Sequence, residues 1–147
     1  MKYNIFLSGE IHSNWRKKII EGVQKVELPV SFEHPELDHD QSDHSGSNIL
    51  GNEDKKFWSD HKSAKINSIR IRNGIKKADI VIVKFGEQYK QWNAAFDAGY
   101  AAALGKSLII VHPEEFDHAL KEIDSAAHAT ARTHSQVIEI LKYLCRE

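Results

Sequence analysis

The stretch from residue 79 to residue 112 most constrains the fold, because two buried-strand patterns flank one helical pattern. Residues 79–84 and 107–112 are short Val- and Ile-rich runs bounded by polar residues, which is typical of strands buried on both faces of a sheet. The Ala-rich part between them closes at Gly105, which indicates a helix with a C-terminal glycine. Together they predict a βαβ unit, whose strands are parallel.

One acidic residue, Asp97, lies within this Ala-rich helix. With Asn93 as the expected N-cap, Asp97 falls in the second turn, near the positive end of the helix dipole, which should favour its ionised form. That end of the helix faces the crevice beyond the carboxyl ends of the strands, where ligands bind. Asn93 and Tyr100 share its helix face, so we expect a catalytic site here. The alternatives are a structural carboxylate paired with a Lys or Arg, and a Tyr100 buried in the core.

The rest of the chain also alternates between strand and helix patterns. Residues 3–8 and 30–33 are expected strands, and residues 126–131 form a weak edge strand. Helices are expected over residues 64–77 and 116–123, and the capping-box pattern Thr133-x-x-Gln136 opens a last helix. Right-handed crossovers and helices on both faces predict a three-layer, doubly wound α/β fold. We expect one domain over residues 1–147, with a flavodoxin-like parallel sheet of about five strands in the order 2-1-3-4-5.

The turn after the first strand reads Ser8-Gly9-Glu10-Ile11-His12. Its glycine allows the backbone to approach a ligand closely, and Ser13 is a candidate cap for the next helix. The turn lacks the GxGxxG pattern, so it gives no support to a dinucleotide or P-loop phosphate site.

Residues 34–61 are polar, without clear periodicity, and are rich in His and Asp. We expect a long loop here, and three interpretations stay open: a substrate-contacting lid, an ordinary solvated loop, or a metal site. Because the spacing matches no recognisable ligand set, we expect a lid that closes over the site rather than a structural metal centre.

Composition limits the possible partners and compartment. A net charge of −1 argues against a dedicated nucleic-acid polymer binder. The single Cys145 excludes a disulfide within one chain and fits a reducing cytosol. With no apolar run of about 18 residues and no signal-peptide pattern, we expect a cytoplasmic protein without a membrane segment.

Longer motifs resemble a known family. Residues 78–83, 95–101 and 104–106 resemble the signature of nucleoside 2-deoxyribosyltransferases. Residues 85–100 and 118–124 are similar to the YtoQ family, a branch of that superfamily, over nearly the whole chain. The resemblance implies a transferase or hydrolase that acts on the N-glycosidic bond of a small-molecule nucleoside or nucleotide, and we expect no cofactor.

The resemblance also implies residue roles. In the superfamily the helix acid, usually Glu, is the nucleophile at the sugar C1′, and this role falls on Asp97, with Tyr100 and Asn93 orienting it. The expected substrate-binding residues are Ser8, Gly9, Glu10, His12, Asp43 and Trp92. Tyr89 and Trp58 are further candidates for stacking on the base.

The sequence does not single out one residue as the general acid. The positions where the superfamily places other acidic residues hold Lys84 and Gln91. The remaining candidates for protonating the leaving base are His12, Glu10, Asp38 and Asp43.

Two other functions remain open. The chain could be a nucleotide-binding or sensing module without turnover, or an enzyme of different chemistry that uses the His- and Asp-rich segment and a metal.

Aromatic residues in polar segments predict a homo-oligomer, most simply a dimer, because a monomer would expose them. These residues are Phe57, Trp58, Tyr89 and Trp92.

Overall fold

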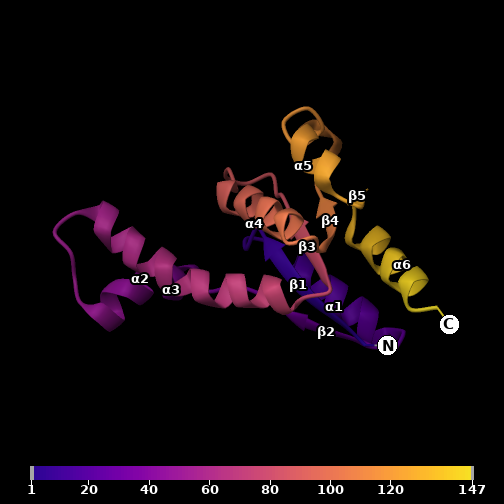
Figure 1. Cartoon of the computed structure of the whole chain (residues 1–147), viewed down its shortest axis with the longest axis horizontal. Helices are drawn as coiled ribbons and strands as arrows, with labels where there is room; N and C mark the ends of the chain where they lie inside the picture. The colour runs from indigo at the N-terminus through magenta and orange to yellow at the C-terminus, as the bar shows by residue number, and fades with distance from the viewer. Residues whose placement is uncertain (1, 147) are drawn as a thin grey trace.

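The computed structural model describes residues 2–146 and shows a five-stranded sheet with helices on both faces (Figure 1). The strands are β1 (Tyr3–Gly9), β2 (Val30–Glu33), β3 (Ile80–Lys84), β4 (Ser107–Val111) and β5 (Ala129–Ala131). Every neighbouring pair is parallel, and the order is β2-β1-β3-β4-β5. The predicted fold class and strand order are therefore confirmed.

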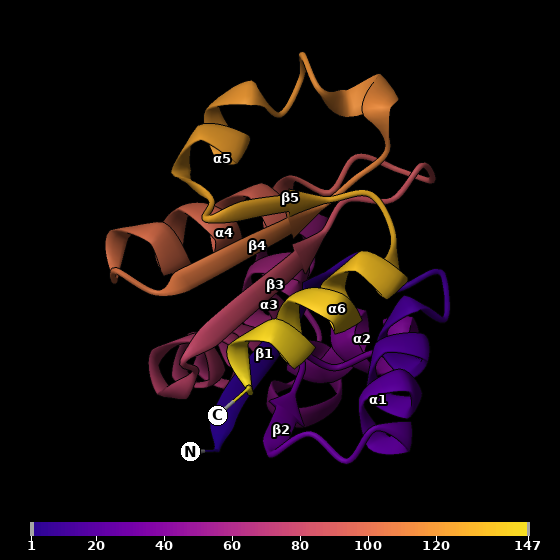
Figure 2. The same ribbon diagram turned by 90° about the vertical axis from the view of Figure 1, so that its right-hand side faces the viewer.

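Helices cover the two faces of the sheet (Figure 2). They are α1 (Trp15–Lys25), α2 (His39–Leu50), α3 (Lys56–Lys77), α4 (Trp92–Ala103), α5 (Lys121–Ala126) and α6 (His134–Leu144). Helices α1 and α6 pack on one face, whereas α3, α4 and α5 pack on the other. The helix expected over residues 116–123 is displaced: a short 3-10 turn spans Glu114–Phe116, and α5 begins later. None of the helices within residues 2–146 is long and apolar enough to cross a membrane.

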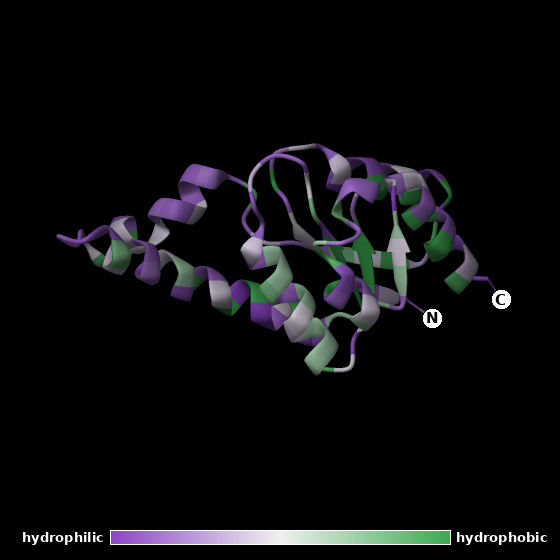
Figure 3. Cartoon of the chain, turned by 90° about the horizontal axis from the view of Figure 1, so that it is seen from above, coloured by the Kyte–Doolittle hydropathy of each residue, from purple (hydrophilic) through white to green (hydrophobic). Residues whose placement is uncertain are grey.

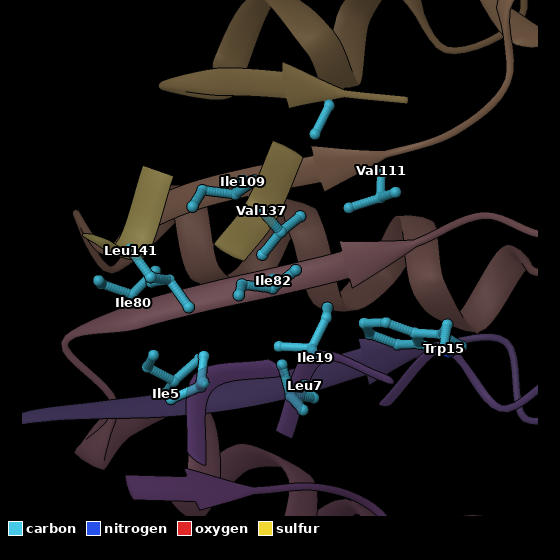
Figure 4. Close-up of a cluster of buried hydrophobic side chains, with 12 residues drawn as sticks. Ile5, Leu7, Trp15, Ile19, Ile80, Ile82, Ile109, Val111, Val137 and Leu141 are labelled. Carbon is cyan, nitrogen blue, oxygen red and sulfur yellow. The ribbon is translucent and has the colours of Figure 1, made fainter. Parts of the chain in front are cut away.

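The strands bury side chains on both faces, as their Val- and Ile-rich composition predicts. In β1, Ile5 and Leu7 join the cluster under α1 and α6 (Figure 4), while Phe6 points to the opposite cluster. Hydrophobic residues gather accordingly in the sheet, whereas α2 is mostly hydrophilic (Figure 3). Burying each such side chain contributes roughly 1.5–3 kcal/mol, so the sheet is a stable base for residues at its carboxyl edge.

Helix α4 lies close to the sheet because its inner face is built from alanines. Ala94, Ala98 and Ala101 are at most 1% exposed. The helix ends at Ala103 with Leu104 as its C-cap, and the predicted glycine, Gly105, follows directly with a φ of 68° that favours glycine and an N–H that donates to the Ala102 carbonyl oxygen at 3.0 Å. The predicted N-cap, Asn93, is wrong by two residues.

The N-cap of α4 is Gln91. Its carbonyl oxygen accepts the first helical bonds, from the N–H groups of Ala94 and Ala95. Its side chain closes the preceding loop: Oε1 accepts from the Gly86 N–H at 2.8 Å, and Nε2 donates to the Tyr89 carbonyl oxygen at 2.8 Å. The closed loop fixes where the helix begins, and Asp97 remains in its second turn.

The prediction of a long loop over residues 34–61 is wrong. Helices α2 and α3 form a hairpin that projects away from the sheet (Figure 1), and α3 begins eight residues before the expected residue 64. Small polar residues hold the hairpin together. The Ser63 hydroxyl accepts from the Gly46 N–H at 3.0 Å and donates to the Asp43 carbonyl oxygen at 2.6 Å, and Asn67 Nδ2 donates to the Ser42 carbonyl oxygen at 2.9 Å. Apolar periodicity does not reveal such an interface.

Candidate active site

The centre of the site is a buried carboxylate–hydroxyl pair at the carboxyl edge of the sheet. Asp97 is 6% exposed, and the fully buried Ser8, near the end of β1, donates its hydroxyl hydrogen to Asp97 Oδ2 at 2.5 Å. Within residues 2–146 this is the only side-chain hydrogen bond to Asp97. The bond fixes one carboxylate oxygen and leaves Oδ1 for another partner.

Burial changes the acidity of Asp97. Desolvation raises the pKa of this carboxyl from 3.8 to about 6, and the Ser8 hydrogen bond opposes part of that rise. Burial therefore acts against the effect expected of the helix N-terminus, which favours the ionised form. At pH 7 the carboxylate is still about nine-tenths ionised, and its limited hydration leaves it a stronger nucleophile than a solvated Asp.

Asp97 borders two neighbouring hollows. The larger, of about 660 Å³, lies between α3 and α4 and is lined by Asp43, Asn93 and Tyr100 among others. The smaller, of about 290 Å³, extends to the turn after β1 and is lined by Ser8, Gly9, Glu10, His12, Asp43, Asn93 and Asp97. The structure thus brings together all but one of the expected site residues.

The exception is Trp92. Its side chain is 76% exposed, its ring lies 5.7 Å from the Lys90 ammonium, and it lines neither hollow. Trp58 also lies outside, packed edge-on against Phe57 in α3. The aromatic residues that do border Asp97 are Tyr89, Tyr100 and Phe96, and Phe96 is a residue that sequence reasoning missed.

Residues of the segment 34–61 border the site mainly from α2 and α3, and Pro35 and Glu36 do so from the loop before α2. Asp43 lines both hollows, and its carboxylate lies 3.2 Å from Nε2 of His39, one turn earlier in α2. The His12 ring packs on Tyr89 with centroids 4.8 Å apart and lies 6.2 Å from the His39 ring. His39 was missed as a site residue; its spacing of four residues from Asp43 becomes a signal only once α2 is known to be a helix.

Two of the candidate general acids already accept hydrogen bonds from backbone N–H groups. Asp38 caps α2 by accepting from the Gln41 N–H, and it lines neither hollow. The Glu10 carboxylate is bound by N–H groups of its own turn. Ser13 contributes to that turn, whereas the N-cap of α1 is Asn14, so the predicted Ser13 cap is wrong. His12 and Asp43 remain as candidate proton donors.

Among the described residues, no group of three or more His, Cys, Asp or Glu side chains is placed to hold a metal ion.

Sequence comparison gives the family. The family described as nucleoside 2-deoxyribosyltransferase YtoQ matches residues 6–145. The "uncharacterized protein YtoQ" of Bacillus subtilis (strain 168) is 46% identical over 144 residues, which are 98% of this chain and 97% of that protein.

Solved structures share the fold at low identity. The 2-deoxyribosyltransferase of Bacillus psychrosaccharolyticus has a TM-score of 0.56 at 20% identity, covering 92% of this chain and 90% of that one. A conserved protein from Enterococcus faecalis V583 has a TM-score of 0.60 at 11% identity, covering 98% of this chain and 99% of that one. The CMP N-glycosidase of Clostridium botulinum has a TM-score of 0.52 at 15% identity, covering 95% of this chain and 98% of that one. With a deoxyribosyltransferase-like fold and a match along nearly its whole length, the chain belongs to the YtoQ family of nucleoside 2-deoxyribosyltransferase-like proteins.

Proposed function

We propose that this protein cleaves or transfers the N-glycosidic bond of a nucleoside or nucleotide, with Asp97 as the nucleophile. The observation that carries the proposal is the buried Asp97 carboxylate, oriented by Ser8 and open to two hollows at the carboxyl edge of the sheet. The family description and the N-glycosyl chemistry named for two structural neighbours support it.

In this mechanism Oδ1 of Asp97 bonds to C1′ while the bond from C1′ to the base nitrogen breaks. The electron pair of that bond moves to the base, which takes a proton from the general acid. Water or a second base then attacks C1′, the proton of that water or of the attacking base nitrogen passes to the conjugate base of the general acid, and the Asp97 carboxylate is regenerated. Ser8 Oγ–H holds the carboxylate in place through both steps, and Asn93 and Tyr100 border the sugar.

The proton donor in this proposal is His12 or Asp43. Both side chains line the smaller hollow together with Asp97. Nε2 of His39 lies 3.2 Å from the Asp43 carboxylate and helps to hold that side chain at the hollow. Replacement of the true donor should slow the release of adenine or cytosine far more than the release of a nitrophenol, which leaves without protonation.

The experiment is a base-release and base-exchange assay. Nucleosides and nucleoside 5′-monophosphates are incubated with the wild type, Asp97→Asn and a surface control, Asp54→Asn, and free base is measured by chromatography. We expect release with the wild type and with Asp54→Asn, and at least about a thousandfold less with Asp97→Asn. Equal rates for the wild type and Asp97→Asn would exclude the nucleophile role.

A second candidate function is ligand binding without turnover. It is favoured by Gln91, which stands where the superfamily places an acid and whose side chain is used to close the loop of residues 86–91. A thermal-shift response to nucleosides or nucleotides without any base release would support this sensing role.

We also propose a homodimer. Large apolar side chains remain exposed in a single copy: Phe57 is 66% exposed, Trp58 50% and Phe96 60%. A second copy that covers these residues would remove them from water.

A further inference from the structure

The turn between β1 and α1 lies over a buried cation. Arg16 is 4% exposed and lies beneath the turn, where it donates hydrogen bonds to the carbonyl oxygens of Leu7, Gly9 and Glu10 at 3.0, 3.1 and 2.7 Å. The N-terminus of α1, which starts at Trp15, adds its partial positive charge. A turn of this kind at the carboxyl end of a parallel strand is where many α/β proteins bind a phosphate group.

In this chain the anion at the turn is a side chain of the protein itself. Oε2 of Glu10 accepts hydrogen bonds from the backbone N–H groups of His12 at 2.6 Å and Ser13 at 3.0 Å, and Oε1 accepts from the Ser13 hydroxyl. Glu10 is only 5% exposed. Its carboxylate therefore uses the N–H groups that a bound phosphate would otherwise need.

The surroundings are shaped to hold this side chain. A Cβ atom on Gly86, in the loop after β3, would come within 2.7 Å of Glu10 Cγ. The charge of Glu10 also counters the effect of burial on Arg16, whose pKa burial lowers to about 10. Glu10 is thus the counter-ion of a buried cation as well as the occupant of the turn.

Glu10 also forms part of the wall of the smaller hollow that contains Asp97. We propose that Glu10 is a specificity-determining residue, a built-in anion at the end of the substrate cavity that accepts an uncharged hydroxyl group of the substrate and rejects a phosphate group there. The proposal rests on the proposed function for the identity of the substrate as a nucleoside. The occupied turn itself does not depend on that function, and it can be tested separately.

The larger hollow does not offer an equivalent phosphate site. Its three cationic side chains, Lys56, Lys65 and Arg72, are matched in number by three carboxylates of the same hollow, Asp43, Asp60 and Asp97, and Lys56 is paired with Asp60 at 2.8 Å. The Arg72 guanidinium lies over the Tyr100 ring, 5.9 Å from its centroid. The charge balance around Asp97 therefore favours a neutral nucleoside over its 5′-monophosphate.

The first experiment measures thermal stability with inorganic phosphate, with sodium chloride of equal ionic strength as the reference. We expect no specific shift for the wild type and a saturable rise of about 3 °C for Glu10→Ala, because phosphate enters the emptied turn. Glu87→Ala is the matched control, since it removes an exposed carboxylate beside the turn without emptying it, and it should behave like the wild type.

Glu10→Ser is measured in parallel in case Glu10→Ala does not fold, because it also empties the turn while leaving a small polar side chain. We expect the same direction with a smaller rise. Specific phosphate stabilisation of the wild type would overturn the proposal, and so would the absence of a gain in every folded Glu10 variant.

The second experiment compares the binding of a nucleoside and its 5′-monophosphate by calorimetry. The wild type should prefer the nucleoside at least tenfold, and Glu10→Ala or Glu10→Ser should reduce that preference at least tenfold. Equal or tighter binding of the monophosphate by the wild type would overturn the proposal. If the wild type bound neither compound, the proposed function would fail, whereas the phosphate experiment would still decide whether Glu10 blocks the turn.

Discussion

At the scale of single residues, Asp97 combines two properties that oppose each other. Its carboxylate is buried, which disfavours the charge, and the Ser8 hydroxyl supplies one hydrogen bond that recovers part of the lost solvation. The same burial leaves Oδ1 poorly hydrated and available to an electrophilic carbon. Stability and reactivity are therefore expected to change in opposite directions when this residue is replaced.

Asp97→Asn should stabilise the protein in a pH-dependent way. The pKa of the carboxyl is 3.8 in the unfolded reference and about 6 in the fold, so the native state loses stability as the pH rises through this interval. The gain in the free energy of unfolding of Asp97→Asn over the wild type is on the order of 3 kcal/mol above pH 6 and vanishes below about pH 4. Urea unfolding of both proteins at pH 4 and pH 7.5 measures it; an equal difference at both values would contradict the burial argument.

Ser8→Ala should act through Asp97. Without the Ser8 hydrogen bond the pKa of the Asp97 carboxyl should rise further above its present value of about 6, and the acid limb of the pH profile of kcat/KM should move to higher pH. We expect activity at pH 7 to fall by about tenfold, since both the ionised fraction and the orientation of the carboxylate decrease. An unchanged pH profile would show that Ser8 does not tune this group.

At the scale of elements, the sequence predicted what apolar periodicity can encode. The strands of the βαβ unit and the Ala-rich face of α4 were found in this way, and the capping box of α6 was found from its Thr-x-x-Gln motif. The hairpin of α2 and α3 escaped, because its interface consists of a glycine and small polar side chains. His39 escaped with it, and so did the engagement of Glu10, which depends on three-dimensional contacts within one turn.

Gly46→Ala tests how closely the two helices of the hairpin approach. A Cβ atom at residue 46 would lie 2.5 Å from Lys62 Cβ and 2.6 Å from the Ser63 nitrogen, so the substitution should destabilise the protein by about 1–3 kcal/mol. Gly99→Ala in α4 is the control: nothing lies within 4 Å of its added Cβ, and it should stabilise by about 0.5–1 kcal/mol. The midpoints of denaturant unfolding compare the two variants, and equal effects would contradict the close approach of α2 and α3.

At the scale of the whole molecule, exposed aromatic residues predict self-association. Light scattering at micromolar concentration should give the mass of a dimer, and Phe57→Ser combined with Trp58→Ser should shift it toward the monomer. Lys55→Ser combined with Lys65→Ser is the matched control on the same hairpin and should keep the dimer. A wild type that is entirely monomeric under these conditions would contradict the prediction.

The proposed mechanism requires a covalent bond between the Asp97 carboxylate and the sugar. The most direct measurement is intact-protein mass spectrometry after incubation with nucleosides fluorinated at C2′, because the electron-withdrawing fluorine slows breakdown of a glycosyl intermediate. We predict a mass increase of one fluoropentosyl group in the wild type, located on Asp97 by peptide mapping, and none in Asp97→Asn. Release of base without such an adduct, or an adduct on another residue, would contradict the assignment of Asp97 as the nucleophile.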